Sequence, residues 1–260
     1  MLELDKIYNE DCLVGMKDIP DGSIDMICTD LPYGVLNEQS EGGSWDSIIP
    51  FEPLWEQYLR VIKPNGAIVL FCQGMFTAKL MMSQPRIWRY NLIWDKINRP
   101  TGFLDANRRQ LRIHEDIAVF YKSQPTYNPQ MSVGTASHRR GAAGNAILAG
   151  GKNRCYGVFK LTNPEYTNEK YPTSIVAIDK EHSGNEFHPT QKPVDLIRYL
   201  IRTYSNEGET ILDSCMGSGT TAIACVKEKR HFIGFEIDKG YYAQACKRVE
   251  QAKQQLTLDL

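Results

Sequence analysis

The sequence predicts an α/β protein with a doubly wound, mostly parallel β-sheet and an inserted region between its two halves. Three observations predict this fold class. Apolar, β-prone runs alternate with helical patterns over residues 1–122, the alternation resumes from residue 188, and a glycine loop separates a strand from a helix within residues 209–238. Apolar strands that alternate with helices are typical of a parallel sheet covered on both faces.

The first half is expected to alternate strands and helices. Leu13, Met16 and Ile19 have helical spacing, and Pro20 and Gly22 end that helix. The polar residues 35–50 predict a mobile loop. Strands are predicted at residues 4–8, 24–28, 67–71, 90–94 and 117–121, and helices at 12–19, 53–62 and 74–82.

The second half repeats this alternation after an irregular stretch. Residues 123–187 are rich in Gly, Asn, Ser, Thr and Pro and have poor periodicity, which predicts an insertion of loops and short strands. After it, helices are predicted at residues 194–204, 220–229 and 241–254, and strands at 210–213 and 231–236.

Composition indicates one globular chain with no strong charge preference. The 260 residues carry a net charge of −1 and are 42% hydrophobic, so one sizeable core plus an insertion is expected. A nucleic acid would therefore have to be bound by a local basic patch.

The cysteines and the N-terminal residues indicate a cellular location. The seven cysteines include no CxxC pair, which argues against a structural zinc site or a disulfide framework. No signal-peptide pattern and no apolar run of membrane-spanning length is found. We expect a cytoplasmic protein with no metal and no membrane contact.

The glycine loop predicts a cofactor site. Asp213 ends a strand, Gly217 and Gly219 allow close approach of a ligand, and the following helix offers free N–H groups to an anion. Glu236, at the end of the next strand, could accept hydrogen bonds from ribose hydroxyls. A GxG sequence alone also fits an ordinary tight turn. Because no Lys-Ser/Thr pair follows, the loop is not a P-loop, and a different nucleoside-containing cofactor is predicted.

A second group of polar residues follows another predicted strand. In Asp30-Leu31-Pro32-Tyr33, a carboxylate can accept an N–H, and the proline keeps residue 31 extended so that its carbonyl can do the same. The tyrosine offers a face for stacking. These features suit chemistry on an amino group attached to a flat ring. The alternative is a strand end, a proline turn and a tyrosine that covers the core.

These segments resemble the motifs of amino-group DNA methyltransferases, which transfer a methyl group from S-adenosylmethionine to adenine N6 or cytosine N4. Residues 30–33, DLPY, resemble the family's DPPY; residues 213–221, DSCMGSGTT, resemble DPFxGSGTT; residues 188–193 are similar to its HPTQKP element. The order is the permuted, β-class one. The resemblance implies a circularly permuted class I methyltransferase fold.

The resemblance also implies an organisation and partners. Residues 1–122 would form the catalytic half, 123–187 an inserted target-recognition region, and 188–260 the cofactor-binding half. S-adenosylmethionine would be the cofactor and double-stranded DNA the substrate. A homodimer and a cognate restriction nuclease are suggested by the resemblance alone.

Residue roles follow from the same resemblance. Asp30 and the Leu31 carbonyl would hold the target amine beside Pro32, and Tyr33 would stack on the flipped base. The implied cofactor contacts are Asp11 at the adenine, Glu236 at the ribose, Thr190 and Lys192 at the carboxylate, and Asp213, Gly217, Gly219 and Thr220 at the methionine end. Asp30 and Ser218 are further implied cofactor contacts.

Simpler roles remain open for several of these residues. Thr190 and Asp11 could be helix caps, and Lys192 a solvated charge. Two positions also depart from the family pattern. Leu31 replaces the first proline of DPPY, and Cys215 replaces the phenylalanine of the cofactor loop, which puts aromatic packing beside the cofactor in doubt.

The expected mechanism is direct transfer without a covalent enzyme intermediate. No cysteine follows a proline, so the Pro-Cys nucleophile of cytosine-C5 methyltransferases is missing. The target base cannot be reached inside a duplex, so we expect base flipping, with the loop at residues 34–50 closing over the base.

DNA contacts are expected from basic residues in the insertion and the loop before it. Arginine suits both phosphates and guanine edges. Any one of these residues could instead be a solvated surface charge. The candidates are Arg99, Arg108, Arg109, Arg112, Arg139, Arg140, Lys152 and Arg154.

Adenine N6 is the expected target, because Asp at the first motif position favours adenine in this family. Cytosine N4, for which the family usually has Ser, is the first alternative. An enzyme acting on RNA or on a protein glutamine amide is a second alternative. A catalytically silent DNA- or cofactor-binding subunit is a third.

Overall fold

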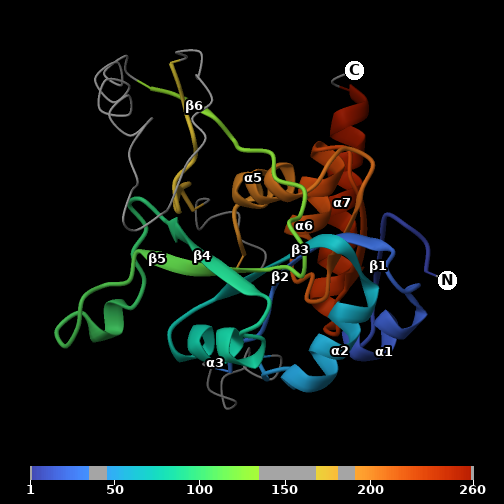
Figure 1. The fold of residues 1–260 in the computed structure, drawn as a ribbon, viewed down its shortest axis with the longest axis horizontal. Helices are drawn as coiled ribbons and strands as arrows, with labels where there is room; N and C mark the ends of the chain where they lie inside the picture. Colours follow the sequence, from blue (N-terminus) through green and yellow to red (C-terminus); the bar gives the residue numbers. More distant parts are fainter. Residues whose placement is uncertain (1, 35–45, 135–167, 181–190, 259–260) are drawn as a thin grey trace, which may run out of the picture. The chain divides into compact units, whose positions relative to one another are not determined.

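The structure is a computed structural model that describes residues 2–34, 46–134, 168–180 and 191–258 (Figure 1). The chain forms two compact units, of which the larger comprises Met1–Asn128 with Ser174–Leu260 and the smaller Pro129–Thr173. In the smaller unit, β6 (Ser132–Val133) pairs antiparallel with β7 (Glu169–Lys170).

The larger unit is built on a mostly parallel sheet, which confirms the predicted fold class. Its described residues give eight strands in the order β1-β10-β9-β2-β3-β5-β4-β8. All neighbouring pairs are parallel except those that involve β5. The strands are β1 (Lys6–Tyr8), β2 (Ile24–Asp30), β3 (Ile62–Cys72), β4 (Trp88–Asp95), β5 (His114–Phe120), β8 (Ile175–Ala177), β9 (Thr210–Asp213) and β10 (His231–Phe235).

Strand β5 is the exception within the mostly parallel sheet, since it is antiparallel to both of its neighbours. The reason lies in the connection from β4 to β5. It contains the 3₁₀ turn η2 (Phe103–Asp105) but no crossover helix, so the chain turns back as a long hairpin. Strand β5 thereby enters the sheet between β3 and β4.

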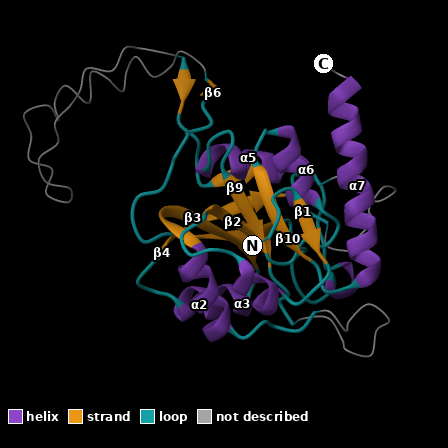
Figure 2. Ribbon diagram, turned by 90° about the vertical axis from the view of Figure 1, so that its right-hand side faces the viewer, coloured by secondary structure: helices purple, strands orange, loops and turns teal. Residues whose placement is uncertain are grey.

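Helices cover both faces of the sheet (Figure 2). Val69 and Phe71 of β3 belong to one apolar cluster, while Ile68 and Leu70 belong to the other, as the two-residue period of a strand requires. α1 (Cys12–Gly15), α2 (Phe51–Val61) and α3 (Met75–Ser83) pack on one face, and α5 (Val194–Tyr204), α6 (Thr220–Lys227) and α7 (Lys239–Leu258) on the other. None of the helices in the described ranges is long and apolar enough to cross a bilayer.

Two predicted elements differ from the structure. The helix expected at residues 12–19 is only one turn of α-helix followed by the 3₁₀ turn η1 (Met16–Asp18), because Pro20 prevents continuation. Residues 63–66, which lie between the helix predicted at 53–62 and the strand predicted at 67–71, are part of β3, whose pairing with β2 shifts register between Ile24 and Met26.

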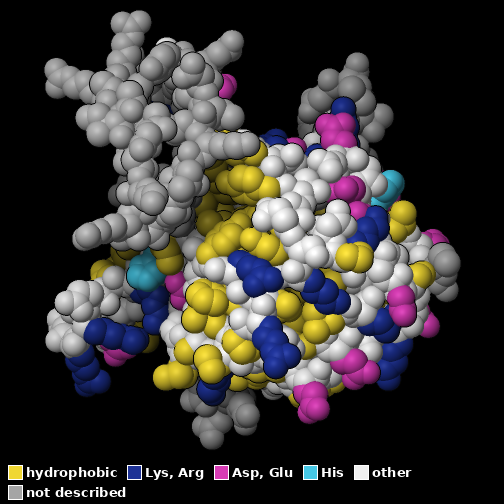
Figure 3. Space-filling view, in the orientation of Figure 1, with side chains coloured by type: hydrophobic (Ala, Val, Ile, Leu, Met, Phe, Trp, Pro, Cys, Tyr) yellow, Lys and Arg dark blue, Asp and Glu magenta, His cyan; other side chains and the backbone are white. Residues whose placement is uncertain are grey.

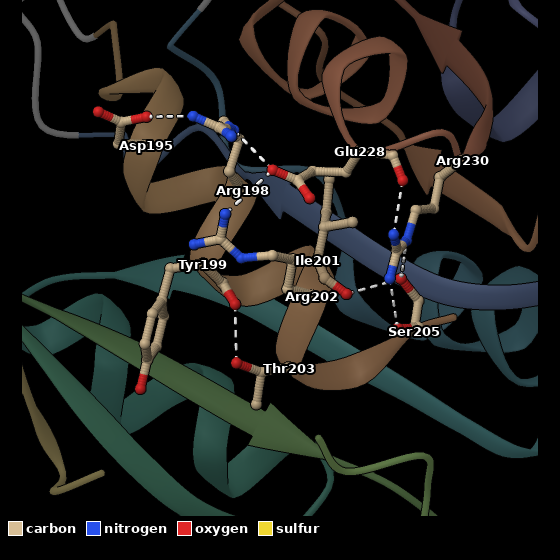
Figure 4. A network of polar contacts seen from close by, with 9 residues as sticks. All are labelled: Asp195, Arg198, Tyr199, Ile201, Arg202, Thr203, Ser205, Glu228 and Arg230. Carbon is tan, nitrogen blue, oxygen red and sulfur yellow. Dashed lines mark hydrogen bonds and ion pairs between the residues drawn. The ribbon is translucent and has the colours of Figure 1, made fainter. Parts of the chain in front are cut away.

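An ionic network ties α5 to the end of α6 (Figure 4). Glu228 Oε1 accepts hydrogen bonds from Arg198 Nε at 2.6 Å and Arg202 Nη1 at 3.1 Å. Arg230 donates to the backbone carbonyl of Ser205 at 2.8 Å. This network lies away from the strand ends described next and has a structural role.

The neighbours β2 and β9 define the switch point of the sheet. From β9 the chain passes through α6 to β10 on one side, whereas from β2 it passes through α2 to β3 on the other. The connections therefore diverge and leave a crevice beyond the carboxyl ends of β2 and β9. Asp30 ends β2 and Asp213 ends β9.

Candidate active site

A cavity of about 530 Å³ occupies this crevice and is lined by both groups of residues singled out in the sequence. Its size is within the usual range for sites that hold a small molecule. The predicted site residues in its wall are Asp11, Asp30, Leu31, Pro32, Tyr33, Lys192, Asp213, Gly217, Ser218, Thr220 and Glu236.

Asp30 lies at the centre of a hydrogen-bonded group. Its Oδ1 accepts a hydrogen bond from the Tyr33 hydroxyl at 2.7 Å, and its Oδ2 accepts one from Lys192 Nζ at 2.5 Å. Burial raises the pKa of Asp30, and the ammonium of Lys192 opposes that rise. The carboxylate at the end of β2 is thus paired with a residue from the segment just before α5.

Lys192 is not a solvated charge, because only 7% of its surface is exposed. Besides Asp30, its ammonium lies 3.2 Å from Glu115 Oε2, and Lys96 Nζ lies 2.5 Å from Glu115 Oε1. Four charged side chains, two acidic and two basic, therefore form a continuous cluster in the cavity wall.

Lys96 and Glu115 are not among the residues predicted from the sequence. They come together because β4 and β5 form an antiparallel pair in which Trp94 is opposite Glu115. Burial alone would raise the pKa of Glu115, but the ammonium groups of Lys192 and Lys96 outweigh it and lower the pKa to about 2. Burial would lower the pKa of Lys192, but Asp30 and Glu115 raise it.

The glycine loop is fastened to the Glu236 carboxylate. Gly217 N–H donates to Glu236 Oε2 at 2.7 Å, and Asp238 N–H donates to Oε1 at 2.8 Å. Gly217 has φ 53°, which favours glycine, and thereby aims its N–H at the carboxylate. Burial raises the pKa of Glu236.

Asp213 is buried between the two halves of the site. It accepts hydrogen bonds from the Thr29 hydroxyl at 2.5 Å and from the Cys215 N–H at 3.0 Å. Burial raises the pKa of Asp213 to about 6, against the effect of these donors. Cys215 lies in the cavity wall, and a hydrogen bond to Cys12 together with burial raises the pKa of its thiol.

Gly219 is not among the residues that line the cavity. It caps the start of α6 with φ 82°, and a Cβ there would lie 3.1 Å from the Cβ of Ala245 in α7. Its position indicates close packing of the loop on a helix. Its neighbours Ser218 and Thr220 line the cavity, with their hydroxyls 3.2 Å apart.

Asp11 and Thr190 are the two residues for which the sequence leaves a helix-capping role open. Asp11 is the N-cap of α1, accepting the Leu13 N–H at 2.7 Å, and it also lines the cavity. Thr190 lies outside the described residues, and the N-cap position of α5 is occupied by Pro193.

The DLPY segment is held by its own contacts. The Leu31 side chain is buried in the core, and the Tyr33 ring packs 5.0 Å from the ring of Phe76. Asp46, not singled out in the sequence, accepts the N–H groups of Tyr33 and Gly34 at 2.9 and 3.0 Å. It connects the end of the predicted 34–50 loop, of which 35–45 lie outside the described residues, to the site.

The basic residues predicted to contact DNA fall into two sets. Arg99, Arg108, Arg109 and Arg112 lie on the β4–β5 loop, whose Lys96 and Thr101 line the cavity. Lys and Arg side chains are visible over that loop, at the lower left of Figure 3. Arg109 pairs with Asp105 at 2.5 Å and Arg99 with Asp179 at 3.7 Å. The other four, Arg139, Arg140, Lys152 and Arg154, lie outside the described residues.

Comparison with known proteins gives consistent matches over nearly the whole chain. A family model described as DNA methylase (N6_N4_Mtase) matches residues 24–247. The type II methyltransferase M1.MboII of Moraxella bovis is 29% identical, covering 94% of this chain and 96% of that protein. M.BglII of Bacillus subtilis is 28% identical, covering 92% of this chain and 67% of that protein.

Solved structures of DNA methyltransferases are similar as well. The M1.HpyAVI–SAM complex superposes with a TM-score of 0.60 at 25% identity, covering 94% of this chain and 98% of that one. The cytosine-N4-specific PvuII DNA methyltransferase has a TM-score of 0.64 at 15% identity, covering 96% and 91%, and supports the fold alone. With the family model matching most of its length, the chain belongs to the DNA methylase family of N6- and N4-type methyltransferases, which use S-adenosylmethionine.

Proposed function

We propose that the protein is an S-adenosylmethionine-dependent methyltransferase that modifies adenine N6 in a specific duplex DNA sequence, by base flipping and direct methyl transfer. The observation that supports this most is the shared cavity. Asp30 and Tyr33 at the end of β2 face the same space as the glycine loop and Glu236, which follow β9 and β10.

The chemistry of an exocyclic amine explains the residues on the β2 side. Its lone pair is delocalised into the ring, so the amine is a poor nucleophile. Two acceptors, the Asp30 carboxylate and the Leu31 carbonyl, would draw the amine toward tetrahedral geometry and stabilise its developing positive charge. The Tyr33 ring, supported by Phe76, would stack on the flipped base.

The residues on the β9 side fit the cofactor. When bound, S-adenosylmethionine supplies the electrophilic methyl group. Glu236 is a buried carboxylate already oriented by two backbone N–H groups, which suits ribose hydroxyls. Gly217, Ser218 and Thr220 would hold the methionine end with Asp213, and Asp11 would lie at the adenine. We assign Gly219 a contribution through the shape of the loop, because it backs on Ala245.

DNA would be held by the β4–β5 loop and by residues 123–187. This region contains the smaller compact unit, Pro129–Thr173, and we assign it to target recognition. Arg108 and Arg112 belong to a loop that adjoins the cavity, where phosphate contacts would position a flipped base. Arg139, Arg140, Lys152 and Arg154 would contribute from the region itself. A homodimer and a cognate nuclease remain predictions.

The choice of adenine rests on Asp30 in the first motif position. The test is methyl transfer from labelled S-adenosylmethionine to unmethylated genomic DNA, followed by digestion to nucleosides and mass analysis. N6-methyladenine is the expected product. N4-methylcytosine would keep the mechanism and overturn the choice of base. Cofactor binding without any DNA product would overturn the proposal and favour RNA, a protein amide or a silent subunit.

A further inference from the structure

Both oxygens of the Asp30 carboxylate have partners in the cavity. The Tyr33 hydroxyl donates a hydrogen bond to Oδ1, and the Lys192 ammonium donates one to Oδ2 at 2.5 Å. The target amine becomes positively charged during methyl transfer, and the Asp30 carboxylate would stabilise that charge. An ammonium 2.5 Å from the same carboxylate repels the developing positive charge and opposes this stabilisation. Lys192 in its present place would therefore hinder the reaction proposed above.

Glu115 offers Lys192 another place. Its Oε1 is held by Lys96 at 2.5 Å, whereas its Oε2 is a buried oxygen that forms no hydrogen bond to any described residue. That oxygen lies 3.2 Å from Lys192 Nζ, within ion-pair distance but without hydrogen-bond geometry. A small movement of the Lys192 ammonium would complete this hydrogen bond, and a buried carboxylate oxygen without a hydrogen bond is costly.

We propose that Glu115 is a positioning residue of the methyl-transfer site: it receives the Lys192 ammonium from Asp30 when the target amine reaches that carboxylate. The inference rests on the proposed function. Lys96 holds Glu115 in place through the oxygen that Lys192 does not use. The four side chains carry two negative and two positive charges. When the Lys192 ammonium moves from Asp30 to Glu115, the net charge of the cluster therefore stays the same.

If the role of Glu115 were purely structural, its place in the cavity wall would make no difference to methyl transfer. Glu228 is a close structural counterpart, since it also accepts two cationic partners and its side chain is 11% exposed, against 12% for Glu115. Yet Glu228 lies in the α5–α6 network of Figure 4 and is absent from the cavity wall. Glu228→Gln is therefore a matched control for Glu115→Gln.

The first measurement is the kinetics of methyl transfer by wild type, Glu115→Gln and Glu228→Gln, with kcat and KM taken in the steady state and the rate of the chemical step checked under single-turnover conditions. The glutamine at 115 keeps the shape but loses the charge that attracts Lys192, so kcat should fall by about 10- to 100-fold, the loss of one charged hydrogen bond. KM for cofactor and DNA should change little. Glu228→Gln should lower stability and leave kcat within about twofold of wild type.

The second measurement is the pKa of the Asp30 carboxyl, followed by carbon-13 NMR without cofactor or DNA. Besides Glu115, the titratable groups that face Asp30 are Tyr33, Lys192, Cys28, Cys72 and Asp213. Glu115→Gln should lower the pKa of Asp30, because a negative charge is lost and Lys192 stays on Asp30. Lys96→Gln should raise it, and provides the test if Glu115→Gln does not fold.

The outcomes separate the two claims. If wild type methylates DNA and Glu115→Gln is as fast as wild type, the positioning role is overturned and the proposed function stands. An Asp30 pKa unchanged by Glu115→Gln, or changed equally by Glu228→Gln, would also overturn it. If wild type transfers no methyl group to DNA, the proposed function fails first, and the role in transfer fails with it even if the pKa moves.

Discussion

The hydroxyl of Thr29 donates a 2.5 Å hydrogen bond to the carboxylate of Asp213. Thr29 precedes Asp30 on β2, and Asp213 precedes the glycine loop on β9, so one bond joins the two halves of the site across neighbouring strands. The residues are 184 positions apart in the chain. The spacing between the proposed amine site and the proposed cofactor site is therefore set by the sheet and does not depend on loop geometry.

Asp30→Asn should abolish most of the turnover. The amide keeps the size but loses the charge that would stabilise the amine, so kcat should fall by about 100- to 1000-fold. Cofactor and DNA affinity, measured by calorimetry and gel shift, should stay near wild type. Asp25→Asn is the control, because Asp25 also pairs with a lysine, Lys63, but is not in the cavity wall. Equal losses in both variants would indicate a structural effect.

Tyr33→Phe should move the acid limb of the kcat profile to higher pH. The tyrosine hydroxyl stabilises the charged form of Asp30, so its loss raises the pKa of Asp30 further. Because the proposed mechanism requires the charged carboxylate, activity should then be lost at a higher pH than in wild type as the pH falls. Tyr33→Ala, which also removes the stacking ring, should add a loss at every pH. An unshifted acid limb in Tyr33→Phe would contradict the coupling.

Glu236→Gln should weaken cofactor binding. One charged acceptor for ribose hydroxyls becomes neutral, which corresponds to a loss of about 10- to 100-fold in affinity. Titration calorimetry with S-adenosylmethionine and its demethylated product measures this effect. DNA binding, tested in parallel, should be unchanged. A variant that binds the cofactor as tightly as wild type would exclude Glu236 as the ribose ligand.

Asp213→Asn should stabilise the protein at neutral pH. The folded-state pKa of about 6 lies above the usual value, so the buried carboxylate destabilises the fold as pH rises from about 4 to about 6, and the penalty is constant above that range. It amounts to about 3 kcal/mol at pH 7 and vanishes below about pH 4. Urea unfolding of both proteins at pH 4 and pH 7 measures it. The same difference at both pH values would disprove the ionic origin.

Gly219→Ala should destabilise the protein more than Gly208→Ala. Both glycines have φ near +80°, but a Cβ at residue 219 would lie 3.1 Å from Ala245, whereas at residue 208 it would meet nothing within 4 Å. The backbone strain, about 1–2 kcal/mol, is common to both. The clash with α7 should add about 1–3 kcal/mol, measured as the free energy of unfolding. Equal losses would show that α7 yields to the added methyl group.

The fold could be predicted in most parts because its signals are local. The helix at residues 194–204 and the strand at 210–213 have the limits that the apolar pattern predicted. The two groups of site residues could also be located, since ligands bind beyond the carboxyl ends of parallel strands and Asp30 and Asp213 follow such strands. The family model confirmed the family.

The charged cluster could not be predicted, because it depends on contacts between distant segments. Lys96 and Glu115 come together only because β5 pairs antiparallel with β4. Lys192 contacts Glu115 although the inserted region separates the two residues in the sequence. Each residue taken singly has the pattern of an ordinary surface charge. Gly219 illustrates the same limit, since its sequence context does not distinguish a ligand-facing glycine from one that packs on a helix.

The separation of β1 from β2 in the sheet has a consequence for synthesis on the ribosome. These strands follow one another in the chain, yet β10 and β9 lie between them. Until residues 210–235 emerge, β2 has an unpaired edge and β1 has no strand to pair with, so a nascent chain exposes strand edges prone to aggregation. The Asp30 carboxylate is synthesised early, but the wall of its cavity is complete only after residues 213–241 have emerged.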